Sequence, residues 1–340
     1  LKMLSEISKE SSRKLYVVPV TITYEKLKEI EEYKHEGTAG KKPESDNFFT
    51  RLGNLLSINY GPVYIRFARP VYLSTKFSVE TAFRIAETQE KQTVISFSSV
   101  FSTLFLTFEN ITSRELVERM EFICDELQKI NYVRTATSLK NLDVNCSKLL
   151  SKLVKKGDII QTSVDEREAF SLKDRAVPEF LFYKNSISFA FAPLFCLISK
   201  DLSSNDLIIE FLENVIMGFN RPMLLGLEID TSNYPEWFNK TVKRFFFEKF
   251  SSLKNLLEIL LSNDDIFTKQ LSRTDFVDRI FPAVNKKIRT FTKDELFEAI
   301  FFLEKKTVLT NNLTDLNREL AESYVSGTDD VLKFIQREET

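Results

Sequence analysis

Few side chains in this sequence are of the types that carry acid–base, nucleophilic or metal chemistry. The 340 residues include one histidine, His35, which stands among Lys and Glu residues. In such a charged segment we expect a solvated surface histidine. The three cysteines, in apolar or helical surroundings, are Cys124, Cys146 and Cys196. Their odd number and the lack of zinc-like Cys/His spacing predict buried free thiols in a reducing compartment, without disulfides.

Two strand-like runs near the N-terminus would have to position any site. Residues 17–24 are β-branched or aromatic apart from one proline. This pattern is typical of a strand buried on both faces and predicts an interior strand of an α/β sheet. Residues 61–71 form the second run, and between the runs we expect helices over 26–34 and 48–58 with a loop over 37–46. The unit is a strand, a helical excursion and a second strand.

These runs also carry a family resemblance. V-P-V-T-I-T-Y-E at residues 18–25 and G-P-V-Y-I-R-F-A-R-P-V at 61–71 resemble the last conserved block of the glycerol-3-phosphate acyltransferase family. They are most similar to the large bacterial enzyme, with dihydroxyacetone-phosphate acyltransferase as the sister family. F-L-F-Y-K-N-S-I-S-F-A-F-A-P at 180–193 is similar to the Y-(R/K)-N-x-(I/L) helix in the C-terminal region of the same enzymes. The resemblance covers about the first 75 residues and roughly residues 145–220.

The chain departs from the family in the motifs that carry the chemistry. The family uses H-x-x-x-x-D, in which the histidine is the general base that deprotonates the acceptor hydroxyl and the aspartate orients it. Here Gly40 stands five positions after His35. Glu36-Gly37-Thr38 resembles part of the phosphate-binding motif F-P-E-G-T-R-S, but Ala39 replaces its arginine. In the family that motif also precedes the first strand.

We therefore expect a truncated chain. Leu1-Lys2-Met3-Leu4 lacks an initiator methionine at its first position and resembles the helix that directly follows F-P-E-G-T-R-S in the family. The catalytic base and the phosphate-binding motif would then lie upstream, and the chain alone would not catalyse acyl transfer. The alternative is a gene fragment or degenerate paralogue that has lost catalysis.

The resemblance implies acyl transfer from acyl-CoA or acyl-carrier protein to the first hydroxyl of glycerol 3-phosphate, in phospholipid biosynthesis. It implies no metal, no other cofactor and no covalent enzyme intermediate. The first strand would form a wall of the cleft, with Pro19 shaping its end and Tyr24 near the substrate, although plain sheet packing suits both residues equally. Arg66 and Arg69 would reach a phosphate or an acyl-carrier surface, or form salt bridges at the strand edge.

Beyond the strands the sequence predicts long helices, because 31 phenylalanines stand against eight glycines and nine prolines. Apolar residues recur at helical spacing over 97–108 and 114–130. Thr112 or Ser113 is a suitable N-cap for the second of these helices.

A further helix, over 145–156, should end at Gly157. Strand-like residues at 159–160 and 169–172 flank a charged turn after it and indicate a hairpin. Helix followed by hairpin predicts a small winged-helix-like unit packed on the helical region, which we interpret as scaffold.

Membrane contact is expected at the surface only. Crossing a bilayer needs about 20 apolar residues, and the best candidates, 180–198 and 94–108, are interrupted or short. Residues 240–250 interleave basic and aromatic side chains, as an interfacial helix does, although these aromatic residues would equally form the buried side of an ordinary helix. With the family resemblance, this predicts peripheral attachment at the cytoplasmic face of the cell membrane. The net charge of −2 argues against a nucleic-acid partner.

We thus expect an α/β N-terminal part, the remnant of the acyltransferase sheet, followed by a mainly α-helical C-terminal region. The predicted segments are 1–78, 79–220 and 221–340. Two classes of function stay open. One is the C-terminal part of an acyltransferase, and the other is a non-catalytic scaffold or partner-binding protein on the same fold.

Overall fold

A computed structural model describes residues 7, 14–25, 62–73, 81, 84–85, 88–89, 91–130, 134–164, 167–216, 229–267, 271–284, 293–310 and 313–337. The chain forms two compact units, Leu1–Ser186 and Ile187–Thr340. The units part at Ser186, whereas the sequence predicted divisions after residues 78 and 220, and that three-part division stays a prediction. Most strands lie in the N-terminal part and helices dominate the rest, which confirms the predicted fold class.

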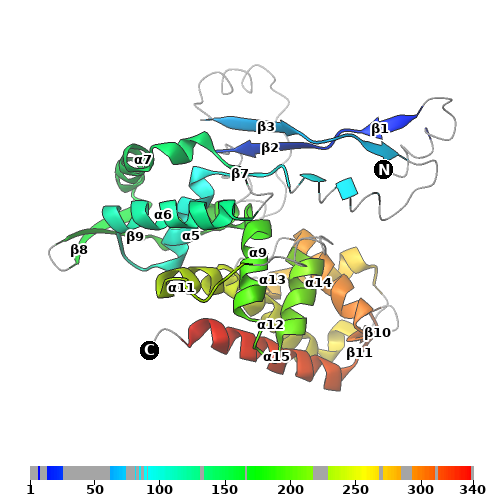
Figure 1. The fold of residues 1–340 in the computed structure, drawn as a ribbon. Helices are drawn as coiled ribbons and strands as arrows, with labels where there is room; N and C mark the ends of the chain where they lie inside the picture. Colours follow the sequence, from blue (N-terminus) through cyan, green and yellow to red (C-terminus); the bar gives the residue numbers. More distant parts are fainter. Residues whose placement is uncertain are drawn as a thin grey trace, which may run out of the picture. The chain divides into compact units, whose positions relative to one another are not determined.

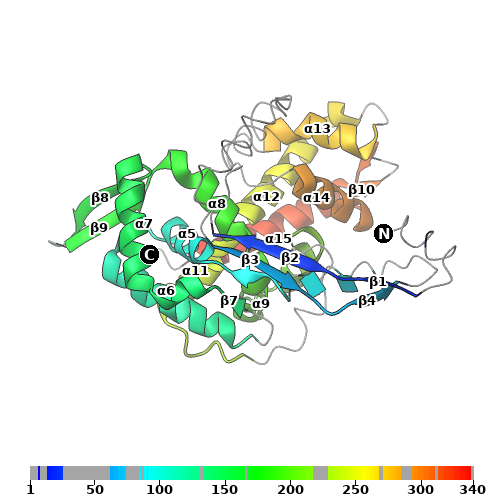
Figure 2. The same ribbon diagram turned by 90° about the horizontal axis from the view of Figure 1, so that it is seen from above.

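Two antiparallel strand pairs begin the first unit (Figures 1 and 2). Their members are β1 (Leu15–Val17) with β4 (Val71–Leu73), and β2 (Val20–Tyr24) with β3 (Val63–Phe67). Each predicted strand is therefore two strands, interrupted at a proline that has no N–H for the ladder, Pro19 in one and Pro70 in the other. The predicted helices over 26–34 and 48–58, and His35 between them, lie outside the described residues.

The rest of the first unit contains a helix, a short strand, two helices and a hairpin. These elements are α5 (Phe97–Thr107), β6 (Ile111–Thr112), α6 (Ser113–Gln128), α7 (Leu142–Lys156), β8 (Ile159–Val164) and β9 (Arg167–Leu172). The strands form an antiparallel sheet in the order β6-β9-β8. This succession and strand order are those of a winged helix. A parallel bridge between β5 (Val94–Ile95) and β7 (Arg134–Thr135) and a 3₁₀ turn at Thr137–Lys140 complete the region.

Local sequence explains the ends of these helices. The Thr112 side chain accepts a hydrogen bond from the Glu115 N–H at 3.2 Å, and the Glu115 carboxylate accepts one from the Thr112 N–H at 3.0 Å. This capping box confirms Thr112 as the N-cap of α6. Gly157 ends α7 with φ 74°, a left-handed conformation that glycine adopts without strain.

The second unit is almost entirely helical. Its helices are α9 (Ser188–Ile198), α10 (Asn205–Phe211), α11 (Glu236–Phe245), α12 (Phe247–Ser262), α13 (Arg273–Val284), α14 (Lys293–Lys305) and α15 (Arg318–Gln336), with a π-helical turn at Leu212–Ile216, a 3₁₀ turn at Asp264–Phe267 and a small hairpin of β10 (Leu309–Thr310) and β11 (Asp315–Leu316). Phenylalanine rings form the core, where Phe250 lies 4.9 Å from Phe211 and 5.9 Å from Phe195 between ring centroids.

The 240–250 segment, considered above as an interfacial helix, belongs to this core. Phe245, Phe246 and Phe250 are buried, and the helix breaks at Phe246 between α11 and α12. The buried-side interpretation is confirmed, and these aromatic side chains are not available to a headgroup layer.

The apolar stretch at 180–198 is not one helix. It divides into α8 (Val177–Asn185), in the first unit, and α9. At the break, the Tyr183 carbonyl oxygen accepts hydrogen bonds from the Ser186 hydroxyl at 2.7 Å and from the Ser186 N–H at 3.3 Å, which closes the end of α8. No single helix among the described residues has both the length and the apolar character needed to cross a membrane, and residues 174–185 and 188–198 meet that test only as a pair.

Candidate functional site

The predicted substrate residues lie on or beside β2 and β3, but they do not converge. In the antiparallel register Tyr24 stands opposite Val63, and Arg66 stands opposite Thr21. Side chains alternate between the two faces of a strand pair, so Tyr24 and Arg66 belong to opposite faces. One site cannot use both side chains from the same side of this pair.

Pro19 and Arg69 lie at the ends of strands. Pro19 is buried between β1 and β2, and its carbonyl oxygen accepts a hydrogen bond of 2.9 Å from the Ala68 N–H. Arg69 is exposed and follows β3. Among the described residues, neither Arg66 nor Arg69 forms an ion pair. Pro19 therefore helps to join the strands, and the exposed guanidinium of Arg69 is accessible to a ligand.

One face of the β2–β3 pair, the inner face, is half-buried against the first unit and consists of Thr21, Thr23, Tyr64 and Arg66. Thr21 Oγ1 donates to the Gln89 carbonyl oxygen at 2.9 Å, and the Val94 N–H donates to Thr23 Oγ1 at 3.4 Å. The Tyr64 hydroxyl lies 3.2 Å from Thr137 Oγ1. Polar contacts thus attach this face to the unit.

The opposite face, the outer face, is apolar and exposed. It consists of Ile22, Tyr24, Val63, Ile65 and Phe67, whose exposed fractions run from 38% for Tyr24 to 71% for Phe67. A sheet with one covered face ordinarily turns its apolar side chains inward and its polar ones toward water. Here that pattern is reversed. The predicted burial of this strand on both faces is therefore wrong in this structure, because two strands have only one face covered.

Glu25 links the end of β2 to helix α5. Its side chain is buried, with 8% of the residue exposed. One carboxylate oxygen accepts the Phe97 N–H and the other accepts the Ser98 N–H, each at 3.2 Å. The Ser138 hydroxyl donates to the same carboxylate, and the Ser98 hydroxyl donates to the Glu25 carbonyl oxygen at 2.6 Å.

This arrangement decides what Glu25 does. The positive end of the helix dipole and the free N–H groups of the first turn of α5 stabilise its negative charge. Both oxygens already accept hydrogen bonds, so we assign Glu25 a positioning role rather than that of a general base. Sequence analysis missed this residue, and its signal was an acidic residue directly after an apolar strand run.

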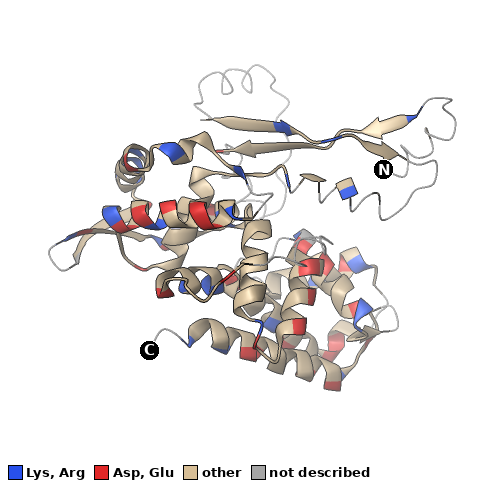
Figure 3. Ribbon diagram, in the orientation of Figure 1, with Lys and Arg blue, Asp and Glu red and all other residues tan. Residues whose placement is uncertain are grey.

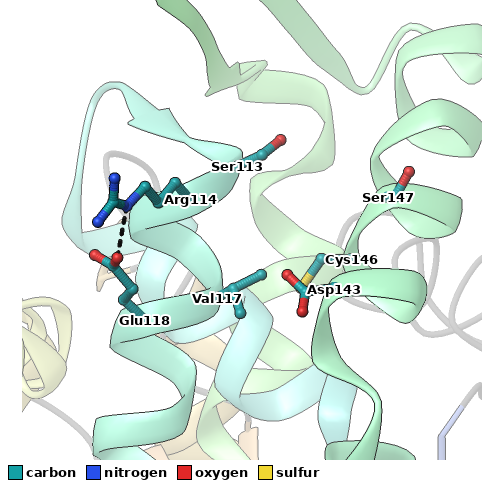
Figure 4. A pocket seen from close by; sticks show the side chains of 7 residues that line it. All are labelled: Ser113, Arg114, Val117, Glu118, Asp143, Cys146 and Ser147. Atoms are coloured by element: carbon teal, nitrogen blue, oxygen red, sulfur yellow. Dashed lines mark hydrogen bonds and ion pairs between the residues drawn. The ribbon is translucent and has the colours of Figure 1, made fainter.

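A hollow of about 380 Å³ opens between α6 and α7, away from the predicted substrate residues. Its lining consists of Ser113, Arg114, Val117, Glu118, Asp143, Cys146 and Ser147. Figure 4 shows Val117 of α6 facing Cys146 and Asp143 of α7. Arg114 forms an ion pair with Glu118 at 2.7 Å, so its positive charge is already balanced within the lining of the hollow.

The thiols are poor nucleophiles. Burial is the main cause that raises the pKa of Cys124, Cys146 and Cys196, each to about 12. They remain protonated at physiological pH, so the thiolate needed for attack is scarce. Cys124 and Cys146 are buried and Cys196 is half-buried, and all three are free, as predicted. Among the described residues, no cluster of three or more His, Cys, Asp and Glu side chains could hold a metal ion.

Part of the chain matches a known protein family. Residues 36–199 match the family model described as glycerol-3-phosphate acyltransferase C-terminal region. The match includes β3, the winged helix, α8 and α9, while β2 and the chain after residue 199 lie outside it. No curated protein matches the chain. The match supports the resemblance stated above, to a C-terminal part of a glycerol-3-phosphate acyltransferase.

Proposed function

Because residues 36–199 match the C-terminal region of the glycerol-3-phosphate acyltransferase family, we propose that this chain is the C-terminal portion of a glycerol-3-phosphate 1-O-acyltransferase. The reaction moves an acyl group from acyl-CoA or acyl-carrier protein to glycerol 3-phosphate. The acceptor hydroxyl oxygen attacks the thioester carbonyl, the thiolate leaves, and the hydroxyl proton passes to a general base.

The reversed β2–β3 pair is the observation that carries this proposal. An apolar outer face with open strand edges is what a strand pair presents when a larger sheet and its helices cover it. We assign that covering to the α/β core of the acyltransferase, which would bring the His–Asp pair that the described residues do not provide. The polar inner face would hold this portion in a fixed position beside the core.

The proposed substrate contacts follow from exposure. Tyr24 on the outer face would form part of the cleft wall when the core covers that face. Arg69, exposed beside the same strands, would pair with the phosphate of glycerol 3-phosphate or with an acidic carrier surface. Arg66 on the inner face and Pro19 at the strand junction would support these two from behind. We place the assembled enzyme at the cytoplasmic face of the cell membrane, attached peripherally.

Acyl transfer from radiolabelled acyl-CoA to glycerol 3-phosphate tests the proposal. The assay compares this chain with the same chain joined to an upstream segment that encodes H-x-x-x-x-D and F-P-E-G-T-R-S. We expect activity only in the longer protein, and a rise in KM for glycerol 3-phosphate when Arg69→Gln is introduced there. The matched control is Arg134→Gln, which removes the same charge from an exposed arginine of β7 and should leave that KM unchanged.

A scaffold function is the second candidate, and the exposed apolar outer face suits it as well. On that account the outer face would cover a separate acyltransferase chain instead of a core joined to it. Inactivity of both proteins in the assay would support this alternative. Activity of the short chain alone would overturn both accounts.

A further inference from the structure

Helix α7 carries a row of lysines on its exposed side. Lys148, Lys152 and Lys155 are spaced four and three residues apart, which places them on one face of a helix. We call these three residues the lysine ridge. All are exposed, and Val144, one turn earlier on the same face, is 52% exposed. Figure 3 marks the Lys and Arg residues of the chain in blue.

The charge of the ridge is not balanced within the unit. Among the described residues, none of the three ridge lysines forms an ion pair, whereas the neighbouring Lys156 is paired with Asp158 at 2.9 Å. Asp143, an acid of α7 itself, lines the hollow between α6 and α7 and does not share the face of the ridge.

The contribution of lysines to helix stability explains only some of the lysines in the ridge. Lys155 lies in the last turn, where a cation favours the negative end of the helix dipole. Lys148 lies two turns before the end of the helix and gains little there. Lys148 and Lys152 repel one another at the (i, i+4) spacing. A ligand of opposite charge would remove this repulsion.

We propose that the lysine ridge of α7 is a docking surface for the anionic face of a lipid bilayer. This inference deepens the proposed function, on which it rests, by naming the surface through which the enzyme meets its membrane. A flat anionic surface attracts a row of point charges without requiring any fixed partner geometry, and each lysine held near it strengthens binding about fivefold. The exposed Val144 would add an apolar contact at the same interface.

Other anionic partners fit the ridge less well. Protein interfaces are depleted in lysine and depend on aromatic and arginine anchors, which the exposed face of α7 does not provide. Bidentate readout of adenine in a DNA groove uses Asn or Gln. The one such residue on α7, Asn145, instead donates to the Ser138 carbonyl oxygen at 2.7 Å. With this amide engaged and a net charge of −2, the chain favours a bilayer over DNA as the partner of α7.

Vesicle binding tests the inference. The full chain is mixed with vesicles of phosphatidylcholine alone or of phosphatidylcholine with phosphatidylserine, and the bound fraction is measured by flotation. We expect binding to the phosphatidylserine vesicles only, and a loss at high ionic strength. The triple variant Lys148→Gln/Lys152→Gln/Lys155→Gln should bind roughly a hundredfold more weakly. Gln and Lys have similar helix propensity, so the helix should persist, which its thermal transition would confirm.

The matched control removes the same charge elsewhere. Lys14→Gln/Lys173→Gln/Lys200→Gln alters three exposed lysines outside α7 that, among the described residues, form no ion pair either, and it should bind as the unchanged chain does. Equal binding by the ridge variant and the control would overturn the inference. So would tighter binding of the unchanged chain to a DNA duplex than to the phosphatidylserine vesicles, or its failure to bind those vesicles. None of these results requires catalysis, so the inference can fail while the acyltransferase assay still succeeds.

Discussion

The junction at Glu25 provides the sharpest test of how the strand pair is attached to the first unit. Glu25→Gln keeps the shape of the side chain but replaces one acceptor oxygen with an NH₂ group. That group would face a backbone N–H of α5, donor against donor. A hydrogen bond to a charged group contributes about 1.5–3 kcal/mol, and a negative charge at a helix N-terminus contributes about 0.3–1 kcal/mol. We therefore expect the free energy of unfolding of the first unit to fall by about 2–4 kcal/mol.

For a unit of this size, a loss of 1 kcal/mol lowers Tm by about 2–4 °C. Glu25→Gln should thus lower Tm by about 4–16 °C in a calorimetric scan. Hydrogen exchange at the first turn of α5 should accelerate, because that turn loses its acceptors. The control is Glu109→Gln, which removes the same charge from an exposed position and should change stability by less than about 0.5 kcal/mol. Equal Tm values for the two variants would refute the positioning role of Glu25.

Three further predictions concern the helices and the thiols. Thr112→Ala should destabilise α6 by about 1 kcal/mol. Burial raises the pKa of Glu115, but hydrogen bonds from Thr112 and the charge of Arg119 lower that pKa overall. The stability that the capping box contributes is therefore complete above the ordinary Glu pKa and fades as pH falls through the lowered value, which urea titrations at two pH values would show. The three cysteines should resist a disulfide reagent at pH values well below their pKa of about 12 and react fully only after unfolding in denaturant. Phe250→Ala should cost about 3–5 kcal/mol in chemical denaturation, since its ring is fully buried, and a loss under about 1 kcal/mol would contradict its place in the core.

Features fixed by neighbouring residues could be predicted from the sequence. The N-cap at Thr112, the end of α7 at Gly157 and the following hairpin depend on contacts within a few residues, and the structure confirms each of them. The break at Ser186 was missed because the polar run Lys184-Asn185-Ser186 contains neither proline nor glycine, the residues that most strongly mark a helix end. Glu25 was missed for a different reason, since its partners lie 72 to 113 residues further along the chain.

The candidate site was predicted only as a set of residues, not as a geometry. An apolar strand run shows that a surface will be covered, but it does not show by what. The alternation along β3 was legible in the sequence, with Tyr64 and Arg66 between Val63, Ile65 and Phe67. Only the register with β2 revealed that the polar side faces the unit and that Tyr24 and Arg66 lie on opposite faces.

The reversed strand pair bears on how the acyltransferase core proposed above would bind. An isolated two-stranded ribbon is marginally stable in water, so an apolar ribbon without support would be disordered before it met its partner. Here the inner face is attached through Thr21, Thr23 and Tyr64, and Glu25 fixes the end of β2 to α5. The outer face is therefore already ordered, and the core would not lose affinity by having to order it. Weakening the inner attachment, as Glu25→Gln does, should then weaken docking on the outer face, although no outer side chain has changed.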